Sequence, residues 1–375
     1  MSTPRIPLPD SYEGILNRAQ FAARTGEAEA AIDLYRRLVE KLGRLSDRIL
    51  ARRSDLRDLH LQARLELVDL LRLEGRFAEA IEVAEGLLKT HPEQANIWRR
   101  DVAVLRSSKG EVDRGISELK ALADEDPEDV WTWLVLGNEA RIEGRFSESQ
   151  AALARALEAA KQKDDPKITA NIHYGRFRLF EATGQVDQAV AAWEEAVSAE
   201  PEVGRTVREV VTLLTDAGRY TDAQRFVARD ENKLQAGFQR GVLADLAGDA
   251  AKARKEWQAV ASMDPAELEY GQDCWVEAVL RLADPAPALQ RLPQLLRQHG
   301  SVRLLILSGI AWAMHGNRER AQALFQETIG LLRRARPPKQ KLDSADWRLL
   351  NALVSDAEMK TTLKPYFAVL ETIWG

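Results

Sequence analysis

The sequence has a single cysteine, few aromatic residues and no excess of positive charge. One thiol, Cys274, cannot form an internal disulfide, so we expect a reducing compartment and a small core residue. The net charge of −5 argues against nucleic-acid binding, which usually needs a basic surface. No run approaches the roughly 18 to 20 apolar residues of a membrane span, and the N-terminus lacks the apolar core of a secretory signal. These absences predict a cytoplasmic protein without a membrane span.

Sequence patterns of catalysis and metal binding are also missing. The histidines are scattered without the spacing of metal ligands: His60, His91, His173, His299 and His315. Neither a G-x-x-x-x-G-K-[ST] phosphate loop nor a G-x-S-x-G elbow is present. We therefore expect no enzymatic activity, no metal and no cofactor.

Strand-like alternation is rare, and apolar residues instead recur at helical spacing. The clearest stretch is 130–160, VWTWLVLGNEARIEGRFSESQAALARALEAA. Trp133 and Leu136 share one helical face. Gly144 is expected to end the helix, because a left-handed backbone is cheap for glycine. A second helix then presents its own apolar stripe, so the stretch predicts a helix–turn–helix pair.

Six residues of this stretch fall at the spacing of the tetratricopeptide pattern: Trp133, Leu136, Gly137, Gly144, Leu153 and Ala156. The chain resembles that family of helix–turn–helix repeats. The resemblance implies an all-α fold, a right-handed α-solenoid of about nine such pairs. One pair cannot bury its own stripe, so each pair needs neighbours.

Turn positions recur along the chain at nearly the tetratricopeptide period of about 34 residues. They are Gly26, Gly75, Gly110, Gly144, Gly184, Gly218, Gly248, Ala283 and Gly316. We expect a flexible arm over 1–10 and the solenoid over 11–336. Capping helices should follow over 337–375, interrupted near Pro365.

Three departures from the period carry their own expectations. The first step between turns is about 15 residues too long, which predicts a second helix that continues to Arg52. The polar segment 161–167 is either a hinge between half-arrays or, as we favour, a longer connection. The eighth pair has no turn glycine, and Pro285 suggests helices over 268–282 and 286–298.

In tetratricopeptide arrays the first helix of each pair lines a concave groove, where family members commonly bind peptides. Counting from the turns gives these candidate partner-binding residues in repeats four to six: Trp131, Asn138, Arg141, Asn171, Tyr174, Arg178, Arg205 and Arg208. Arginine offers a planar fork for carboxylates, and asparagine can clamp a peptide backbone. The set is similar in residue type to the carboxylate clamp of co-chaperone arrays, although lysine is absent. We expect a protein partner that supplies a peptide, an acidic segment or a C-terminal carboxylate.

The same residues allow other interpretations. The arginines can instead pair with Glu139, Glu181 and Glu209 on a solvated face. Trp193 and Trp257 occupy the large apolar position of a second helix and are expected in the core. Five apolar residues also fall at groove positions and either form an apolar groove towards the C-terminus or pack where the superhelix is tight: Leu134, Phe238, Leu246, Ile306 and Ile310.

The sequence thus predicts a non-enzymatic interaction scaffold or adaptor. Two alternatives stay open. One is a self-assembling structural array, in which an end such as the apolar ETIWG segment docks into the groove of another copy. The other is a regulatory receptor for a small ligand or peptide, whose superhelix changes pitch on binding.

Overall fold

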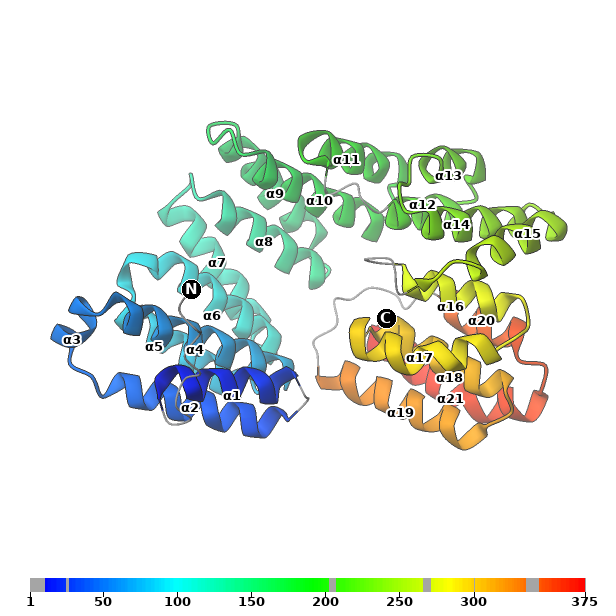
Figure 1. The fold of residues 1–375 in the computed structure, drawn as a ribbon. Helices are drawn as coiled ribbons and strands as arrows, with labels where there is room; N and C mark the ends of the chain where they lie inside the picture. Colours follow the sequence, from blue (N-terminus) through cyan, green and yellow to red (C-terminus); the bar gives the residue numbers. More distant parts are fainter. Residues whose placement is uncertain are drawn as a thin grey trace, which may run out of the picture. The chain divides into compact units, whose positions relative to one another are not determined.

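The protein is all-α. The computed structural model describes residues 11–24, 27–201, 207–265, 271–299, 301–334 and 344–374, and these residues contain helices but no strand (Figure 1). The expected arm over 1–10, the Gly26 turn and Arg205 lie outside the described residues. Helices α1 to α8 belong to one compact unit and α9 to α21 to a second.

The first unit contains three pairs, in each of which a first helix packs on the second helix that follows it, and the unit ends with α8 (Figure 1). Its elements are α1 (Tyr12–Arg24), α2 (Ala28–Gly43), α3 (Asp47–Arg52), α4 (Ser54–Leu73), α5 (Phe77–Thr90), η1 (Pro92–Gln94), α6 (Ala95–Lys109), α7 (Val112–Glu125) and α8 (Val130–Ile142). Helices α1, α4, α6 and α8 are the first helices. Apolar residues of α1, α2, α4, α5 and α6 form one buried cluster, and α7 packs against α6 and α8.

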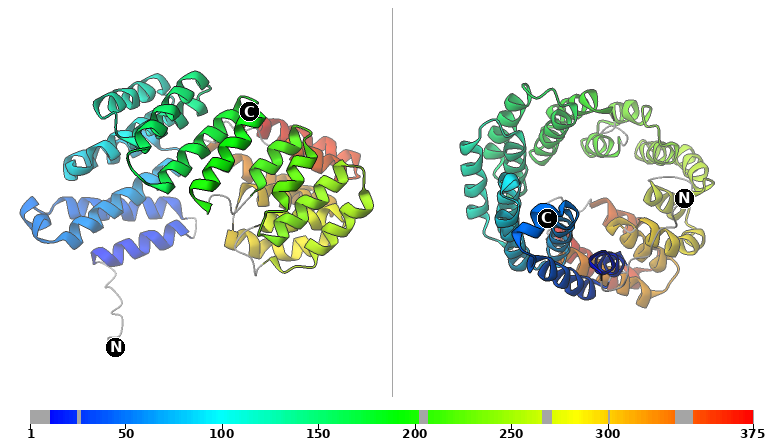
Figure 2. Two further views of the ribbon diagram at one scale, coloured as in Figure 1. Left: turned by 90° about the horizontal axis from the view of Figure 1, so that it is seen from above. Right: turned by 60° about the vertical axis from the view of Figure 1, so that its left-hand side comes forward.

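The second unit continues the pattern, with each pair stacked on the next (Figure 2). Its helices are α9 (Phe146–Ala160), α10 (Pro166–Ala182), α11 (Val186–Ala199), α12 (Arg208–Asp216), α13 (Tyr220–Val227), α14 (Lys233–Leu246), α15 (Ala250–Ala261), α16 (Gln272–Arg281), α17 (Ala286–His299), α18 (Val302–Met314), α19 (Arg318–Arg334), α20 (Ser344–Leu353) and α21 (Ala357–Trp374). First helices are α10, α12, α14, α16 and α18.

The turns between paired helices share one backbone conformation. Eight of the expected turn positions lie among the described residues, and all have a left-handed backbone, with φ between 63° at Ala283 and 102° at Gly110. The residue after the turn closes back onto the helix, as in the 2.8 Å bond from the Arg76 N–H to the Leu71 carbonyl. This is the Schellman closure, which satisfies carbonyls that the helix end leaves open.

The extended second helix predicted for the first repeat is wrong. Helix α2 ends at Gly43, and Ser46 then adopts an extended backbone with ψ 149°. The extra residues form the short α3 and lengthen α4 to 20 residues. The polar residues Arg44, Ser46 and Arg53 leave this charged segment without a long apolar stripe. Burial of an apolar face therefore does not stabilise it as one continuous helix.

The eighth pair and the C-terminal region are helical where the sequence suggested. Helix α16 spans Gln272–Arg281 and α17 spans Ala286–His299, joined through Ala283 with φ 63°. The expected interruption near Pro365 is absent, because α21 runs through this residue from Ala357 to Trp374. Leu363 and Phe367 are both buried on either side of Pro365, and this packing offsets the missing backbone hydrogen bond.

Large apolar residues of second helices fill the space beside glycines of first helices. The Trp257 ring lies against Gly241 and the Phe325 ring against Gly309, where an added Cβ would come within 2.7 Å of the ring. Trp193 and Trp257 are buried, as expected. Cys274 is also buried, which fits its predicted core role. These close contacts fix the spacing of the first helices and therefore of the residues they expose.

Candidate binding surface

The predicted residues of the first unit lie on α8, which begins at a capped N-terminus. The Asp129 carboxylate accepts a hydrogen bond from the Trp131 backbone N–H at 3.1 Å and pairs with Arg100 of α6. This anchoring leaves the Trp131 side chain 43% exposed. Asn138 and Arg141 follow on α8 and are half-buried. Helix α8 thus presents a large aromatic ring to solvent beside the Arg100–Asp129 ion pair.

In the second unit, α10 and α12 are joined by a polar cluster. The Tyr174 hydroxyl lies 2.7 and 2.8 Å from the two carboxylate oxygens of Glu209, and Arg178 Nη1 lies 3.4 Å from one of them. Arg178 Nη1 also lies 3.0 Å from Glu181 Oε2. Burial and the Glu209 carboxylate raise the pKa of Tyr174, so the phenol stays protonated and donates. Asn171, one turn earlier on α10, is exposed.

A second set of ion pairs, here termed the charge ladder, links α12, α16 and α18. Arg208 of α12 pairs with Asp273 of α16, and Arg303 Nε lies 3.3 Å from the same carboxylate. Arg303 Nη2 then lies 2.6 Å from Glu277, which Arg281 contacts at 2.8 Å. Burial alone would raise the pKa of the Asp273 and Glu277 carboxyls, but the arginine charges hold both below their usual values.

Two of the predicted arginines therefore have carboxylate partners inside the second unit. Arg178 pairs with Glu181 and Glu209, as the alternative interpretation expected, whereas Arg208 pairs with Asp273. The Arg178 side chain is only 10% exposed, and the carboxylates over it are 32% and 37% exposed. Solvent at this point meets mainly acceptor oxygens, with the cation beneath them.

The structure brings Asn171, Tyr174, Arg178 and Arg208 to the adjacent helices α10 and α12, and places the α8 residues in the other unit. The carboxylates that complete the site were not among the predicted site residues. Asp273 and Glu277 do fall at groove positions when α16 is counted back from Ala283, and this signal was available in the sequence. Counting positions does not predict that Asp273 contacts Arg208, because the two residues are 65 positions apart in the sequence.

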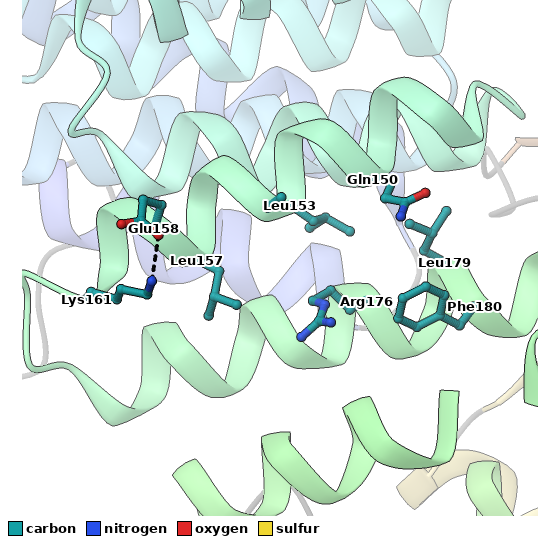
Figure 3. A pocket seen from close by; sticks show the side chains of 9 residues that line it. Gln150, Leu153, Leu157, Glu158, Lys161, Arg176, Leu179 and Phe180 are labelled. Atoms are coloured by element: carbon teal, nitrogen blue, oxygen red, sulfur yellow. Dashed lines mark hydrogen bonds and ion pairs between the residues drawn. The ribbon is translucent and has the colours of Figure 1, made fainter. Parts of the chain in front are cut away.

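A pocket of about 180 Å³ opens between α9 and α10 (Figure 3). Leu153, Leu157, Leu179 and Phe180 form its apolar lining, with Gln150 and Arg176 among the polar residues at its edge. The Lys161 ammonium and the Glu158 carboxylate pair at 2.6 Å at one end. The pocket is smaller than typical ligand sites of about 300 to 1,000 Å³, so it suits a single side chain.

The polar segment 161–167 connects α9 and α10 next to this pocket and lies inside the second unit. Asp164 adopts a left-handed backbone with φ 42°, and the Asp165 side chain caps α10 by accepting from the N–H groups of Lys167 and Ile168 at 2.9 and 3.1 Å. Pro166 at the first helical position continues this start signal. The segment ends one helix and starts the next, which favours a longer connection over a hinge.

Neither metal binding nor membrane insertion is indicated by the part of the chain that the structure describes. Its histidine, cysteine, aspartate and glutamate side chains nowhere gather in a group of three or more that could hold a metal ion. None of its helices combines the length and apolar character needed to cross a membrane.

Comparison with known proteins gives one family match. Residues 61–104, from α4 into α6, match the family model described as tetratricopeptide repeat. No curated protein gives a significant sequence match.

Similar solved structures share little sequence with this chain. They include a tetratricopeptide repeat protein from Parabacteroides merdae ATCC 43184, with TM-score 0.42 and 15% identity, covering 73% of this chain and 99% of that one. BtubC from P. vanneervenii has TM-score 0.41 and 16% identity, with 65% and 93% covered. The human IFIT1 dimer with m7Gppp-AAAA has TM-score 0.43 and 12% identity, with 85% and 76% covered.

Proposed function

We propose that this chain, which matches the tetratricopeptide repeat model over residues 61–104, is a non-enzymatic interaction scaffold that holds a peptide segment of a partner protein on α10 and α12. The observation that carries this proposal is the polar cluster of Tyr174, Arg178 and Glu209, which spans these two first helices. The cluster offers acceptors, a buried cation and an aromatic ring at one place. Those are the groups that fix a peptide in orientation and register.

We further propose that the bound segment is acidic. A partner carboxylate that replaces Glu181 on Arg178 exchanges one ion pair for another. The net gain from the exchange is small, because a solvated ion pair contributes about 0 to 1 kcal/mol. The arginine would therefore select the charge of the partner, while contacts with Tyr174 and Asn171 supply further affinity.

The test removes Glu181, which competes with the partner carboxylate for Arg178, and keeps the arginine itself. Glu181→Gln frees one side of Arg178 and leaves the Tyr174–Glu209 contact in place. Binding of a labelled acidic decapeptide with a free carboxyl end should tighten about two- to fivefold, equivalent to roughly 0.4 to 1 kcal/mol. A charge-inverted lysine decapeptide should bind less well to both proteins. Glu194→Gln is the matched control, since Glu194 lies on α11, outside the two proposed binding helices, and pairs with Arg229.

The outcomes separate the two parts of the proposal. A preference for the lysine peptide, weakened by Glu181→Gln, would refute the acidic partner and leave the scaffold on α10 and α12. Binding of neither peptide would refute this surface. Light scattering of the same samples addresses self-assembly, because a monomer at all concentrations contradicts the structural-array alternative.

A further inference from the structure

One arginine and two histidines of the first unit form a cluster outside the binding surface described above. His60 and Arg64 lie one turn apart on α4, and His91 follows the last residue of α5. Arg64 Nε donates to His60 Nε2 at 3.0 Å. Arg64 Nη1 lies 2.5 Å from where a Cβ on Gly86 of α5 would be, so the guanidinium occupies the space that this glycine leaves. The three residues thus meet between α4 and α5.

Arg64 has no compensating carboxylate among the residues that the structure describes. None of the described Asp or Glu side chains forms an ion pair with Arg64, and its hydrogen bond goes to a neutral imidazole. Arg106 in the same unit differs, because Glu85 and Glu118 pair with it at 2.7 and 2.5 Å and raise its pKa against the effect of burial. Burial lowers the pKa of Arg64 instead. A partly desolvated cation without a counter-charge is energetically unfavourable.

His91 leaves an unused acceptor close to this cation. The Thr90 hydroxyl donates to the Gly86 carbonyl at 3.3 Å and therefore accepts from His91 Nδ1–H at 2.9 Å. With Nδ1 protonated, Nε2 of the neutral ring is an acceptor. This atom is buried and has no hydrogen-bond partner among the described residues. Arg64 contacts Gly86, and Thr90 lies one helical turn after Gly86. The terminal N–H groups of Arg64, which lack an acceptor among the described residues, therefore lie near His91 Nε2, which lacks a donor.

We propose that Arg64, His60 and His91 form a binding site for a small oxyanion, of which hydrogenphosphate is the best match. The two terminal amino groups of Arg64 form a planar fork that suits two anionic oxygens. A hydroxyl on the same anion would donate to His91 Nε2. Water can fill the hydrogen bonds but cannot neutralise the charge, so the unpaired guanidinium favours an anion. The site is distinct from the peptide surface on α10 and α12.

The surrounding charges predict how the histidines report on binding. Burial and the Arg64 charge lower the pKa of His60 to about 4. Burial also lowers the pKa of His91. The Arg57 and Arg64 charges lower this pKa further, whereas the Glu93 and Asp58 carboxylates partly raise it. An anion on Arg64 cancels part of the cationic field that both rings experience. Binding should therefore raise the pKa of His60 and of His91.

The experiment is a phosphate titration of the full chain followed by the ¹³C-labelled histidine rings in NMR spectra. Chloride at equal ionic strength is the reference and acetate tests whether a carboxylate suffices. We expect saturable shifts of the His60 and His91 signals and an upward shift of their pKa values. At a phosphate concentration about ten times Kd, the folding equilibrium constant should increase roughly tenfold. Arg64→Gln should abolish both effects, and Arg64→Lys, which keeps the charge without the fork, should weaken them.

Arg99→Gln is the matched control. Arg99 of α6 pairs with Glu125 of α7 in the same unit, so this substitution should leave the phosphate response unchanged. A response to acetate equal to that of phosphate would support the oxyanion site and show that a partner carboxylate can fill it. Identical histidine spectra in phosphate and chloride would overturn the proposal and identify the site as a water site. This result needs no variant, so it stands even where Arg64→Gln fails to fold.

Discussion

Replacing Gly309 by alanine tests the packing that spaces the first helices of the second unit. The new Cβ would lie 2.7, 2.8 and 3.0 Å from three carbons of the Phe325 ring. Real Cβ atoms do not approach so closely, so either the ring or a helix must move. Phe325 is fully buried and its centroid lies 5.0 Å from that of Phe367. The ring is therefore held from its other side as well.

Two opposing effects set the magnitude. Gly→Ala within a helix stabilises by about 1 kcal/mol through helix propensity. Overpacking of a tight core costs about 1 to 3 kcal/mol. Gly330 of α19 is the matched control, because it lies in a helix interior and an added Cβ there meets nothing within 4 Å. The propensity effect is shared, so the difference between the two variants isolates the packing effect.

We expect Gly309→Ala to lower the free energy of unfolding by roughly 1 kcal/mol and Gly330→Ala to raise it by up to about 1 kcal/mol. Urea unfolding followed by circular dichroism measures both. Phe325→Leu should also be less harmful in the Gly309→Ala background than alone, because the smaller side chain makes room for the new methyl. If both alanine variants are stabilised alike, the ring does not pack on Gly309 as described.

Four further variants test the turn, the charge ladder, the exposed tryptophan and a buried tryptophan for comparison. Ala283 is a non-glycine residue with φ 63°, so Ala283→Gly should stabilise the protein by about 1 kcal/mol in a thermal melt. The Arg303 and Arg281 charges hold the pKa of Glu277 below its usual value, so its contribution to stability is complete at neutral pH and is lost as pH falls through the lowered folded-state pKa. Glu277→Gln should be less stable at pH 7, by roughly 3 kcal/mol, and should lose less stability on acidification to about pH 3. Trp131→Ala should leave the melting temperature nearly unchanged, whereas Trp193→Ala should destabilise by about 3 to 5 kcal/mol.

The repeat architecture was predictable because each turn depends on local chemistry. A residue with positive φ at a fixed distance from an apolar stripe is enough to mark the end of a first helix. Even Ala283, which breaks the glycine rule, was located by the period and has the left-handed backbone of the other turns. Short-range constraints of this kind can be predicted from the local sequence, because they do not depend on tertiary contacts.

Predictions failed where packing decides between local alternatives. The segment after Gly43 has the apolar residues Leu45 and Ile49, which suggested a continuing helix, yet Ile49 is 44% exposed and gains little from one. The opposite holds at Pro365, where local chemistry favours a break but buried neighbours keep α21 continuous. In both places the burial of a few side chains outweighs the local preference.

Charged residues on the first helices show why the binding surface was harder to predict than the fold. Arg208 and Arg64 look alike in sequence, since each lies on a first helix in a polar setting. The fold brings Asp273 to Arg208 from 65 residues away, and that ion pair makes Arg208 part of the charge ladder. It brings Arg64 a neutral histidine and a glycine, and no described carboxylate. An arginine whose charge is satisfied internally can bind a ligand only by exchange. An arginine left without a counter-charge gains from any anion that reaches it, so the less conspicuous residue is the stronger candidate for direct binding.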